Sequence, residues 1–278
     1  MRKACVTGHP VTHSRSPLLH GHWLKTYGIE GAYERVDVPP EGAAAFYRNL
    51  AAHGYVGCNV TIPNKETAFA ALDEADETAA ALGAANTLWV EGGKLHGSNT
   101  DGYGFLANLD ACAQGWDKAR DEVLVLGAGG ASRAIIHALV SRGFGRIHLA
   151  NRTLSRAETV AAPYGGRVVP HDFVNVPQLL KNADVLVNCT SLGMKGQEPL
   201  TLDLAPLPDQ AVVTDIVYVP LMTPLLERAE ARGLRVVDGL GMLLHQGVPG
   251  FERWFGVRPE VTFELRDLLV ADIIGGHA

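Results

Sequence analysis

The sequence has few cysteines and places them far apart. Its 278 residues hold four, Cys5, Cys58, Cys112 and Cys189, with no C-x-x-C pair and no Cys/His spacing typical of a zinc site. The eleven histidines form no H-E-x-x-H motif. These absences exclude a disulfide-stabilised secreted domain and a zinc protease centre. We therefore predict no bound metal and a cytoplasmic location.

Long apolar runs and an excess of positive charge are also absent. No segment approaches the roughly 20 apolar residues that a membrane-spanning helix needs, and Pro10 interrupts the N-terminus before any apolar run reaches signal-peptide length. The formal net charge is −6, whereas a nucleic-acid-binding domain normally has a basic face. We therefore expect neither a nucleic acid nor a membrane as partner.

Short runs of β-branched residues alternate with helical patterns along the whole chain. Predicted strands cover residues 3–7, 33–38, 58–62, 87–91, 94–97, 123–126, 146–150, 184–188, 211–216 and 235–237. Predicted helices lie near residues 17–27, 42–53, 132–141, 155–161, 223–232, 240–255 and 261–274. Ser16 is expected to cap the first helix, with Pro17 at its first position. The alternation is typical of an α/β fold with mainly parallel sheets.

Residues 123–139 (VLVLGAGGASRAIIHAL) read as a strand, a glycine turn and a helix. Glycines let the backbone approach a pyrophosphate, and the helix N-terminus offers free N–H groups to it. Ser132 stands where the G-x-G-x-x-G motif has its third glycine. The turn is thus a variant of the dinucleotide-binding motif, and a ligand-free strand-to-helix turn is the alternative interpretation.

The end of the next strand distinguishes between the two nicotinamide cofactors. An NAD enzyme normally places Asp or Glu there to bind the ribose 2′-OH, but this chain has Asn151, Arg152 and Thr153, with Arg156 one turn later. Guanidinium groups suit a 2′-phosphate, which they bind in a bidentate way. Two solvated arginines at a helix start are the alternative, although cations are unfavourable there. The pattern favours NADP(H).

Polar residues gather at predicted strand ends in the first hundred residues, and each alone has a structural explanation. Ser14 and Ser16 suit a turn and a cap, and Asn86 suits a loop that needs backbone hydrogen bonds. Lys65 suits an exposed helix start, and Asp101 suits the cap of a helix beginning near residue 103.

In combination these segments resemble the shikimate dehydrogenase family. The resemblance extends from about residue 6 to residue 246. It rests on S-R-S-P (14–17), N-V-T-I-P-N-K (59–65), G-A-A-N-T (83–87), N-T-D-G (99–102), G-A-G-G-A-S-R-A (127–134), N-R-T-L-S-R-A (151–157) and D-G-L-G-M-L-L-H-Q (238–246).

The resemblance implies a two-domain fold with a cleft between the domains. Residues 1–102 would form an α/β substrate-binding and catalytic domain, completed by the C-terminal helices of residues 246–278. Residues 103–245 would form a Rossmann-type NADP domain. The reaction implied is the reversible, NADPH-dependent reduction of 3-dehydroshikimate to shikimate, by a monomer or a homodimer.

The resemblance also implies roles for individual residues. Lys65 and Asp101 would be the catalytic pair. The substrate would be bound by Ser14, Ser16, Thr61, Asn86, Tyr218 and Gln246. The cofactor would be lined by Glu77, Gly127, Ala128, Gly129, Gly130, Ala131, Asn151, Arg152, Thr153, Arg156, Ile216 and Gly239. Ser98 and Asn64 depart from residues common in the family, which puts substrate affinity in question but removes no catalytic group.

These residue types suit the chemistry. A positioned acid/base at the reacting oxygen contributes roughly 10²–10⁴-fold to hydride transfer, and we expect Lys65 to act there with Asp101 orienting it. Alternatives are a quinate/shikimate dehydrogenase of the same fold that often uses NAD, a non-catalytic NADP-binding regulator, and a two-domain reductase of the folate or glutamyl-tRNA type. The arginines count against the first, retention of Lys65 and Asp101 against the second, and the S-R-S-P and N-T-D-G segments against the third.

Overall fold

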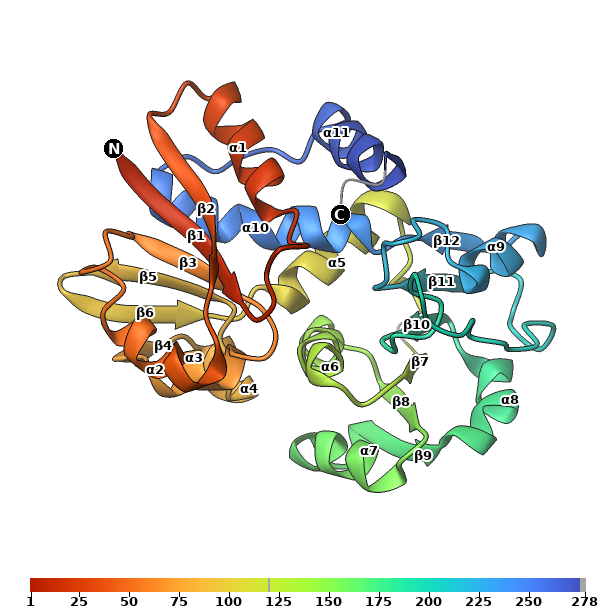
Figure 1. The fold of residues 1–278 in the computed structure, drawn as a ribbon. Coiled ribbons are helices and arrows are strands. Elements are labelled where there is room, and N and C mark those ends of the chain that lie inside the picture. The colour runs from red at the N-terminus through yellow and green to blue at the C-terminus, as the bar shows by residue number, and fades with distance from the viewer. Residues whose placement is uncertain (120, 276–278) are drawn as a thin grey trace. The chain divides into compact units, whose positions relative to one another are not determined.

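The chain forms two compact units. A computed structural model describes residues 1–119 and 121–275 (Figure 1). The first unit contains residues 1–101 and the residues from 243 onward, and the second contains residues 102–242. The boundaries expected from the sequence, 102/103 and 245/246, differ from these by one and three residues. The chain passes between the units within helix α5 (Asp101–Cys112) and within helix α10 (Leu240–Phe255).

The first unit is built on a six-stranded mixed sheet of order β2-β1-β3-β5-β6-β4. Its strands are β1 (Arg2–Gly8), β2 (Gly31–Asp37), β3 (Gly57–Val60), β4 (Glu74–Ala75), β5 (Thr87–Glu91) and β6 (Lys94–Ser98). The pairs β1–β2, β1–β3 and β4–β6 are parallel, and β5 is antiparallel to β3 and β6. Gly92 and Gly93 join β5 to β6 with φ of 60° and 78°, as the tight turn of a hairpin requires.

Helices cover both faces of this sheet. They are α1 (Ser16–Thr26), α2 (Pro40–Arg48), α3 (Lys65–Ala70), α4 (Glu77–Leu82), α10 and α11 (Phe263–Ile274). Helices α2 to α4 pack on one face around Tyr47 and Leu50. On the other face, α1 and the blue helix α10 meet in an aromatic cluster that includes Trp23 and Trp254 (Figure 1). The Trp254 Nε1–H donates to the Leu88 carbonyl at 2.9 Å, and a Cβ on Gly57 would lie 1.9 Å from that nitrogen.

The second unit is a parallel six-stranded sheet of order β12-β11-β10-β7-β8-β9. Its strands are β7 (Glu122–Leu126), β8 (Arg146–Asn151), β9 (Val168–Asp172), β10 (Val185–Asn188), β11 (Val212–Asp215) and β12 (Arg235–Val237). Counted from β7, the order is the 3-2-1-4-5-6 arrangement of the doubly wound nucleotide-binding fold. The order reverses beside β7, so the loop after β7 lies at the switch point, where such folds bind ligands.

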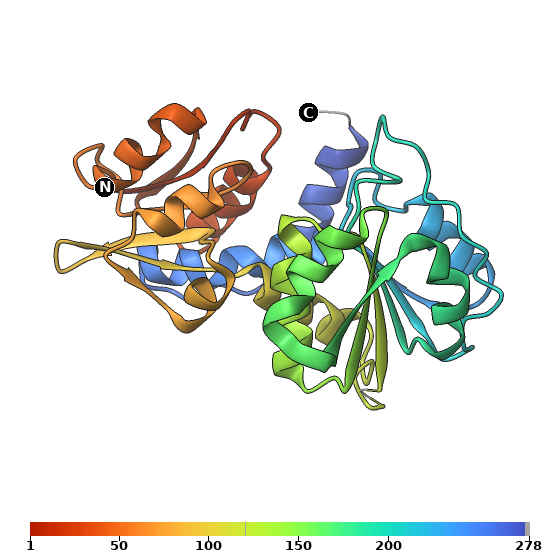
Figure 2. The same ribbon diagram turned by 90° about the horizontal axis from the view of Figure 1, so that it is seen from below.

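Helices lie on both faces of this sheet as well. They are α5, α6 (Gly130–Arg142), α7 (Leu154–Ala161), α8 (Val176–Leu179) and α9 (Pro224–Ala231). Val123 and Val125 pack with α5, α6 and α7, while Leu124 and Leu126 pack with α8 and α9. The strands therefore run between two groups of helices (Figure 2), and the α/β fold with mainly parallel sheets is confirmed.

Several local predictions were wrong at the ends of elements. Arg15, not Ser16, is the N-cap residue of α1, and Ser16 is the first helical residue. Asp101 likewise begins α5 instead of capping a later helix.

Strand β9 was missed because its sequence, VVPHD, contains a proline and two polar residues. Such a sequence is tolerated at a sheet edge, where β9 lies.

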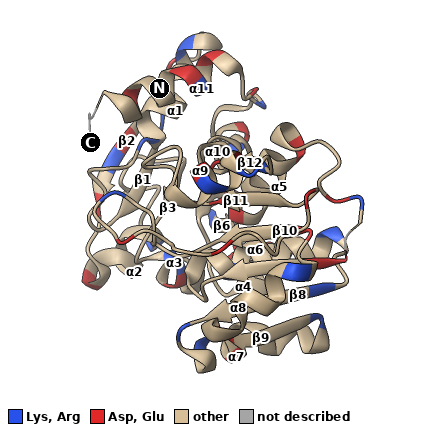
Figure 3. Cartoon of the chain, turned by 90° about the vertical axis from the view of Figure 1, so that its right-hand side faces the viewer, with Lys and Arg blue, Asp and Glu red and all other residues tan. Residues whose placement is uncertain are grey.

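No helix in the described ranges is both long and apolar enough to cross a membrane. Lys and Arg residues are interspersed with Asp and Glu on the elements of both units in the view of Figure 3, so charges of one sign do not gather there.

Candidate active site

Lys65 and Asp101 form an ion pair in the first unit. The Lys65 Nζ lies 2.5 Å from Asp101 Oδ2, and the two side chains are 27% and 6% exposed. Lys65 is the first residue of α3 and Asp101 the first of α5. The pair therefore combines a buried carboxylate with an ammonium group that solvent still reaches, which is the arrangement required of an acid/base that meets a substrate.

Asn86 forms a hydrogen bond to the second oxygen of the Asp101 carboxylate. Its Nδ2 donates to Asp101 Oδ1 at 2.7 Å and to Gln246 Oε1 at 3.3 Å. Asn86 precedes β5, and Gln246 lies on α10. Four of the predicted site residues, Lys65, Asp101, Asn86 and Gln246, are thus joined by direct side-chain contacts. Both carboxylate oxygens have a donor, which fixes the plane of the carboxyl group.

Backbone contacts hold Lys65 at this place. The Lys65 carbonyl accepts from the Ala85 N–H at 3.0 Å, so the start of α3 is tied to the segment that carries Asn86. The buried Asn64 side chain donates to the Val38 carbonyl at 2.7 Å. Asn64, one of the two departures from the family pattern, therefore anchors the turn before Lys65 to the segment after β2.

Ser14 and Thr61 lie on loops that follow the neighbouring parallel strands β1 and β3, and Ser16 is the first residue of α1. The loop after β1 is bonded to the loop after β3 by the His9 N–H and the Ile62 carbonyl at 3.1 Å. The Arg35 Nε–H donates to the Ser14 carbonyl at 2.9 Å, and the Ser16 N–H to Ser14 Oγ at 3.3 Å. Within the described residues, no side-chain hydrogen bond joins these three hydroxyls to the Lys65 group.

The glycine turn in the second unit is shaped for close backbone approach. Gly127 has a φ of 97°, and a Cβ there would lie 2.9 Å from Thr190 Cγ2. Gly129 caps α6 and Gly130 begins it, and a Cβ on either would meet no atom within 4 Å. No acidic residue stands in the first turn of α6. The exposed glycines, with Ala128 and Ala131 beside them, thus present a helix N-terminus suited to an anion.

Ser132 explains why the third glycine of the motif is dispensable here. Its side chain is fully buried, and its Oγ–H donates to the Gly129 carbonyl at 2.6 Å. The hydroxyl therefore stabilises the turn from the inside of the unit, whereas the exposed edge of the turn is left to Gly129 and Gly130.

The end of β8 lies beside this turn. The Ala128 N–H donates to Asn151 Oδ1 at 3.2 Å, and Asn151 Nδ2 donates to the Thr153 carbonyl at 2.8 Å. Asn151 thus joins the glycine turn to the loop that carries Arg152 and Arg156.

Both arginines are exposed, and within the described residues neither side chain has a hydrogen-bond or ion-pair partner. Asp172 of β9 pairs with Asn151, but its carboxylate accepts from the Val174 N–H. The two guanidinium groups are therefore available to a phosphate.

The remaining predicted residues are divided between the units. Ile216 follows β11 and lies beside Gly239, where a Cβ would stand 2.4 Å from the Ile216 carbonyl oxygen. Tyr218 follows two residues later in the same unit. Glu77 is the exposed first residue of α4 in the first unit, where Asp76 caps the helix.

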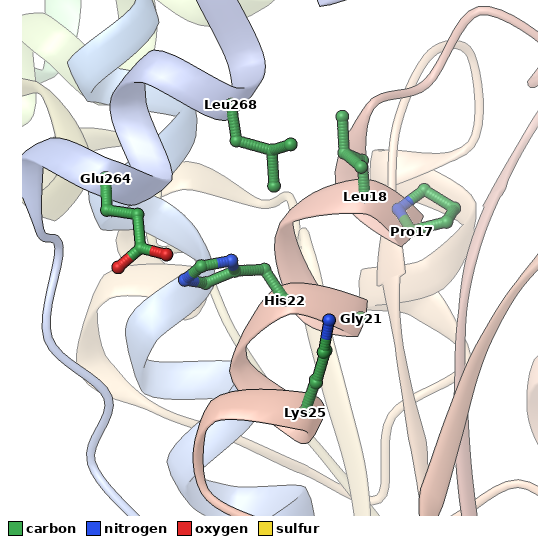
Figure 4. Close-up of a pocket in the computed structure, with 7 residues that line it drawn as sticks. All are labelled: Pro17, Leu18, Gly21, His22, Lys25, Glu264 and Leu268. Atoms are coloured by element: carbon green, nitrogen blue, oxygen red, sulfur yellow. The ribbon is translucent and has the colours of Figure 1, made fainter.

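The first unit also has a groove on its surface. It is a groove of 520 Å³ between α1 and α11, lined by α1 residues from Pro17 to Lys25 and by Glu264 and Leu268 (Figure 4). None of the predicted site residues lines it. Among the described residues, no group of three His, Cys, Asp or Glu side chains is placed to hold a metal ion.

The sequence motifs gave no role to three residues that the structure places around the site. Thr87 and Thr100 contact the Asn86 side chain. Arg15, between the two serines, is buried, and its Nε lies 2.8 Å from Asp272 Oδ2 of α11. The two threonines belong to the G-A-A-N-T and N-T-D-G motifs, so the sequence indicated that they lie near the site. Nothing in the sequence indicated that the distant Asp272 contacts Arg15.

Three family models match the chain. They are described as the shikimate dehydrogenase substrate binding domain over residues 6–88, shikimate / quinate 5-dehydrogenase over residues 111–197, and the shikimate 5′-dehydrogenase C-terminal domain over residues 239–262.

Individual relatives agree with these models. Shikimate dehydrogenase (NADP(+)) of Azorhizobium caulinodans is 62% identical over 273 residues, which cover 98% of this chain and 97% of the relative. A shikimate 5-dehydrogenase of Thermus thermophilus, solved with NADP(H) and shikimate, is 38% identical with a TM-score of 0.83, covering 94% of this chain and 95% of the other. A quinate dehydrogenase of Corynebacterium glutamicum, solved with NAD, is 30% identical with a TM-score of 0.89, covering 97% and 99%. The chain belongs to the shikimate dehydrogenase family.

Proposed function

We infer that this protein catalyses the reversible NADPH-dependent reduction of 3-dehydroshikimate to shikimate, a step of aromatic amino-acid biosynthesis. The observation that carries the inference is the Lys65–Asp101 pair, with its buried carboxylate and its solvent-reached ammonium group. It is accompanied in the same chain by a glycine turn and by two exposed arginines after the neighbouring strand β8. The ion pair supplies an acid/base, and the glycine turn with the nearby arginines suits a phosphorylated dinucleotide.

NADP(H) is the cofactor. We propose that residues 127–131 contact its pyrophosphate, since their backbone is exposed at the start of α6. Arg152 and Arg156, with Asn151 and Thr153 beside them, would bind the 2′-phosphate. Ile216 and Gly239, which lie against each other, would line the nicotinamide end, with Glu77 as a minor contact. When bound, the cofactor supplies or accepts the hydride.

The substrate carries one carboxylate and several ring hydroxyls. We propose that Ser14 and Ser16 bind the carboxylate, and that Thr61, Asn86, Tyr218 and Gln246 contact the ring hydroxyls or the carboxylate. The 3.3 Å bond between Asn86 and Gln246 is the longest in the Asn86 network, so it is the one that a ring hydroxyl would replace. Neutral donors and acceptors of this kind reject a ring that lacks a hydroxyl, because they would be left unpaired.

Lys65 would hold and move the proton. During reduction, its Nζ donates a proton to the carbonyl oxygen of the substrate as that oxygen gains negative charge. During oxidation, the same nitrogen accepts the hydroxyl proton. Asp101 accepts a hydrogen bond from Nζ at 2.5 Å and keeps it directed at the reacting oxygen. Asp101 would also bind the neighbouring ring hydroxyl.

The role of Lys65 can be tested by steady-state kinetics. Lys65→Ala should lower kcat by about 10²–10⁴-fold and leave the KM for shikimate within a few-fold, because general acid/base catalysis acts on the transition state. Lys94→Ala is the matched control: Lys94 also pairs with a carboxylate in this unit, but on the exposed β5–β6 hairpin. If Lys65→Ala preserves kcat and only raises KM, Lys65 is a binding residue.

The activity itself is tested by following the absorbance of NADPH formed from shikimate, beside NAD and quinate as alternatives. The quinate dehydrogenase likeness makes NAD-dependent quinate oxidation the second candidate. We expect shikimate with NADP to give the highest kcat/KM, because the end of β8 carries arginines and no free carboxylate. NADP binding without turnover of either substrate would instead indicate a regulator.

We also propose that the protein is a cytoplasmic monomer or homodimer. All four cysteines are free thiols, as expected in a reducing compartment. Light scattering after size-exclusion chromatography would give the oligomeric state, and fractionation of the source cells would test the location. A larger assembly, or activity in a membrane or secreted fraction, would contradict the proposal.

A further inference from the structure

Two buried threonines surround the amide of Asn86. Thr87 follows it on β5, and Thr100 directly precedes Asp101; both side chains are shielded from solvent. The Thr100 N–H donates to Asn86 Oδ1 at 2.8 Å, and the Thr87 hydroxyl lies 3.0 Å from the same oxygen. The amide oxygen therefore faces threonines only, and the amide nitrogen faces the Lys65–Asp101 pair.

The available hydrogens determine this orientation. A backbone N–H can only donate, so the atom facing Thr100 N must be the amide oxygen. The Thr100 hydroxyl lies 2.9 Å from the Gln246 carbonyl, which can only accept and therefore takes its hydrogen. The Thr87 hydroxyl accepts from Asn59 Nδ2 at 3.2 Å. Its own hydrogen goes to Asn86 Oδ1 at 3.0 Å, the nearer of two acceptors, the other being Thr100 Oγ at 3.1 Å.

The orientation matters because a rotated amide would oppose the carboxylate. Asn86 Nδ2 lies 2.7 Å from Asp101 Oδ1, and an oxygen at that place would put two acceptors against each other. Asp101 would then turn away and lose its directed contact with Lys65.

We propose that Thr87 is a positioning residue of the reaction: its hydroxyl group, together with the backbone N–H of Thr100, fixes the Asn86 amide, which holds Asp101 in place for Lys65. The inference rests on the proposed function and adds to it a residue that touches neither the reacting atoms nor Lys65.

The first test compares threonine with valine, which has the same shape, and with serine, which keeps the hydroxyl. Thr87→Val should lower kcat for shikimate oxidation about 3- to 10-fold, the effect of one neutral hydrogen bond, with KM changed less than two-fold. Thr87→Ser should restore most of kcat. Thr7→Val is the control, since Thr7 is equally buried and its hydroxyl contacts Tyr47 and the Asn59 carbonyl instead of Asn86. It should lower the melting temperature and leave kcat unchanged.

The second test asks whether Thr87 acts through Asn86. In an Asn86→Ala background, Thr87→Val should add less than two-fold to the loss of kcat, because the group that it positions is gone. Should Asn86→Ala be too slow to measure, side-chain NMR gives a readout without turnover. The Asn86 NH₂ hydrogens should exchange with solvent about ten-fold faster in Thr87→Val than in the wild type and Thr87→Ser, since one neutral hydrogen bond that fixes the amide is lost.

The outcomes separate this proposal from the proposed function. If the wild-type protein does not turn over shikimate, the proposed function fails. If it does, and Thr87→Val keeps full kcat, or loses as much in the Asn86→Ala background as alone, or leaves the Asn86 NH₂ exchange unchanged, the positioning role is refuted.

Discussion

His20 should make the stability of the first unit depend on pH. The ring is fully buried on α1 and stacks on Tyr33, with centroids 3.9 Å apart and planes at 10°. The rings of Trp23 and Trp254 also pack against His20, with centroids 5.4 and 5.6 Å from the imidazole centroid. In the described part of the chain, neither ring nitrogen has a hydrogen-bond partner of good geometry. Burial lowers the pKa of His20 from 6.5 to about 3, and the nearby Asn59 side chain opposes part of the shift.

The sign follows from which state binds the proton. Because the pKa is lower in the folded state, the unfolded chain takes up a proton first as the pH falls below 6.5. The free energy of unfolding therefore decreases through the window from pH 6.5 to about 3, by about 1.4 kcal/mol per pH unit. At pH 5 the loss from His20 alone is about 2 kcal/mol.

Urea unfolding at pH 7.5 and pH 5.0 measures this loss. Trp23, Trp89 and Trp254 belong to the first unit and only Trp116 to the second, so tryptophan fluorescence mainly reports the first unit. His20→Phe keeps an aromatic ring in the stack and cannot titrate. The loss between the two pH values should be about 2 kcal/mol smaller in this variant than in the wild type. Equal losses in the two proteins would refute the assignment of a buried neutral imidazole.

Three further substitutions test other features. Replacing Arg152 by Ala should raise the KM for NADP at least ten-fold and leave that for NAD unchanged, since a hydrogen bond to a charged group contributes about 1.5–3 kcal/mol; equal changes for both cofactors would contradict a 2′-phosphate contact. Gly127→Ala should lower the unfolding free energy of the second unit by about 1–3 kcal/mol because of its positive φ, whereas Gly129→Ala, whose Cβ meets no atom within 4 Å, should change it little in thermal unfolding. Asp272→Asn removes the charge beside the buried Arg15 and should cost about 1–3 kcal/mol in urea unfolding, and an unchanged midpoint would count against this contact.

The sequence predicted the second unit well because local chemistry decides it. An apolar run, a turn that demands glycine and an amphipathic helix follow one another within residues 122–142, and each signal is short-range. The edge strand β9 escaped prediction because one unpaired edge tolerates Pro170 and polar residues, so its sequence need not resemble a strand.

The residues of the candidate site could be only partly predicted from the sequence. Lys65, Asn86 and Asp101 could be named because they stand in ordered motifs, and the structure brings them into contact. The direction of the Asn86 amide depends on which donors face it in three dimensions, and no spacing rule encodes this. The contact between Arg15 and Asp272 is likewise long-range.

The interrupted course of the first unit has a consequence for synthesis on the ribosome. A chain usually folds its N-terminal domain first as it emerges. Here the second unit is complete once residue 242 has emerged, whereas the strands made earlier still lack the helix that carries Trp254. Until that indole reaches the Leu88 carbonyl, the space above Gly57 has no side chain to fill it. The portion translated first is therefore the last to reach its native packing, and in the meantime it depends on chaperones or on its own solubility.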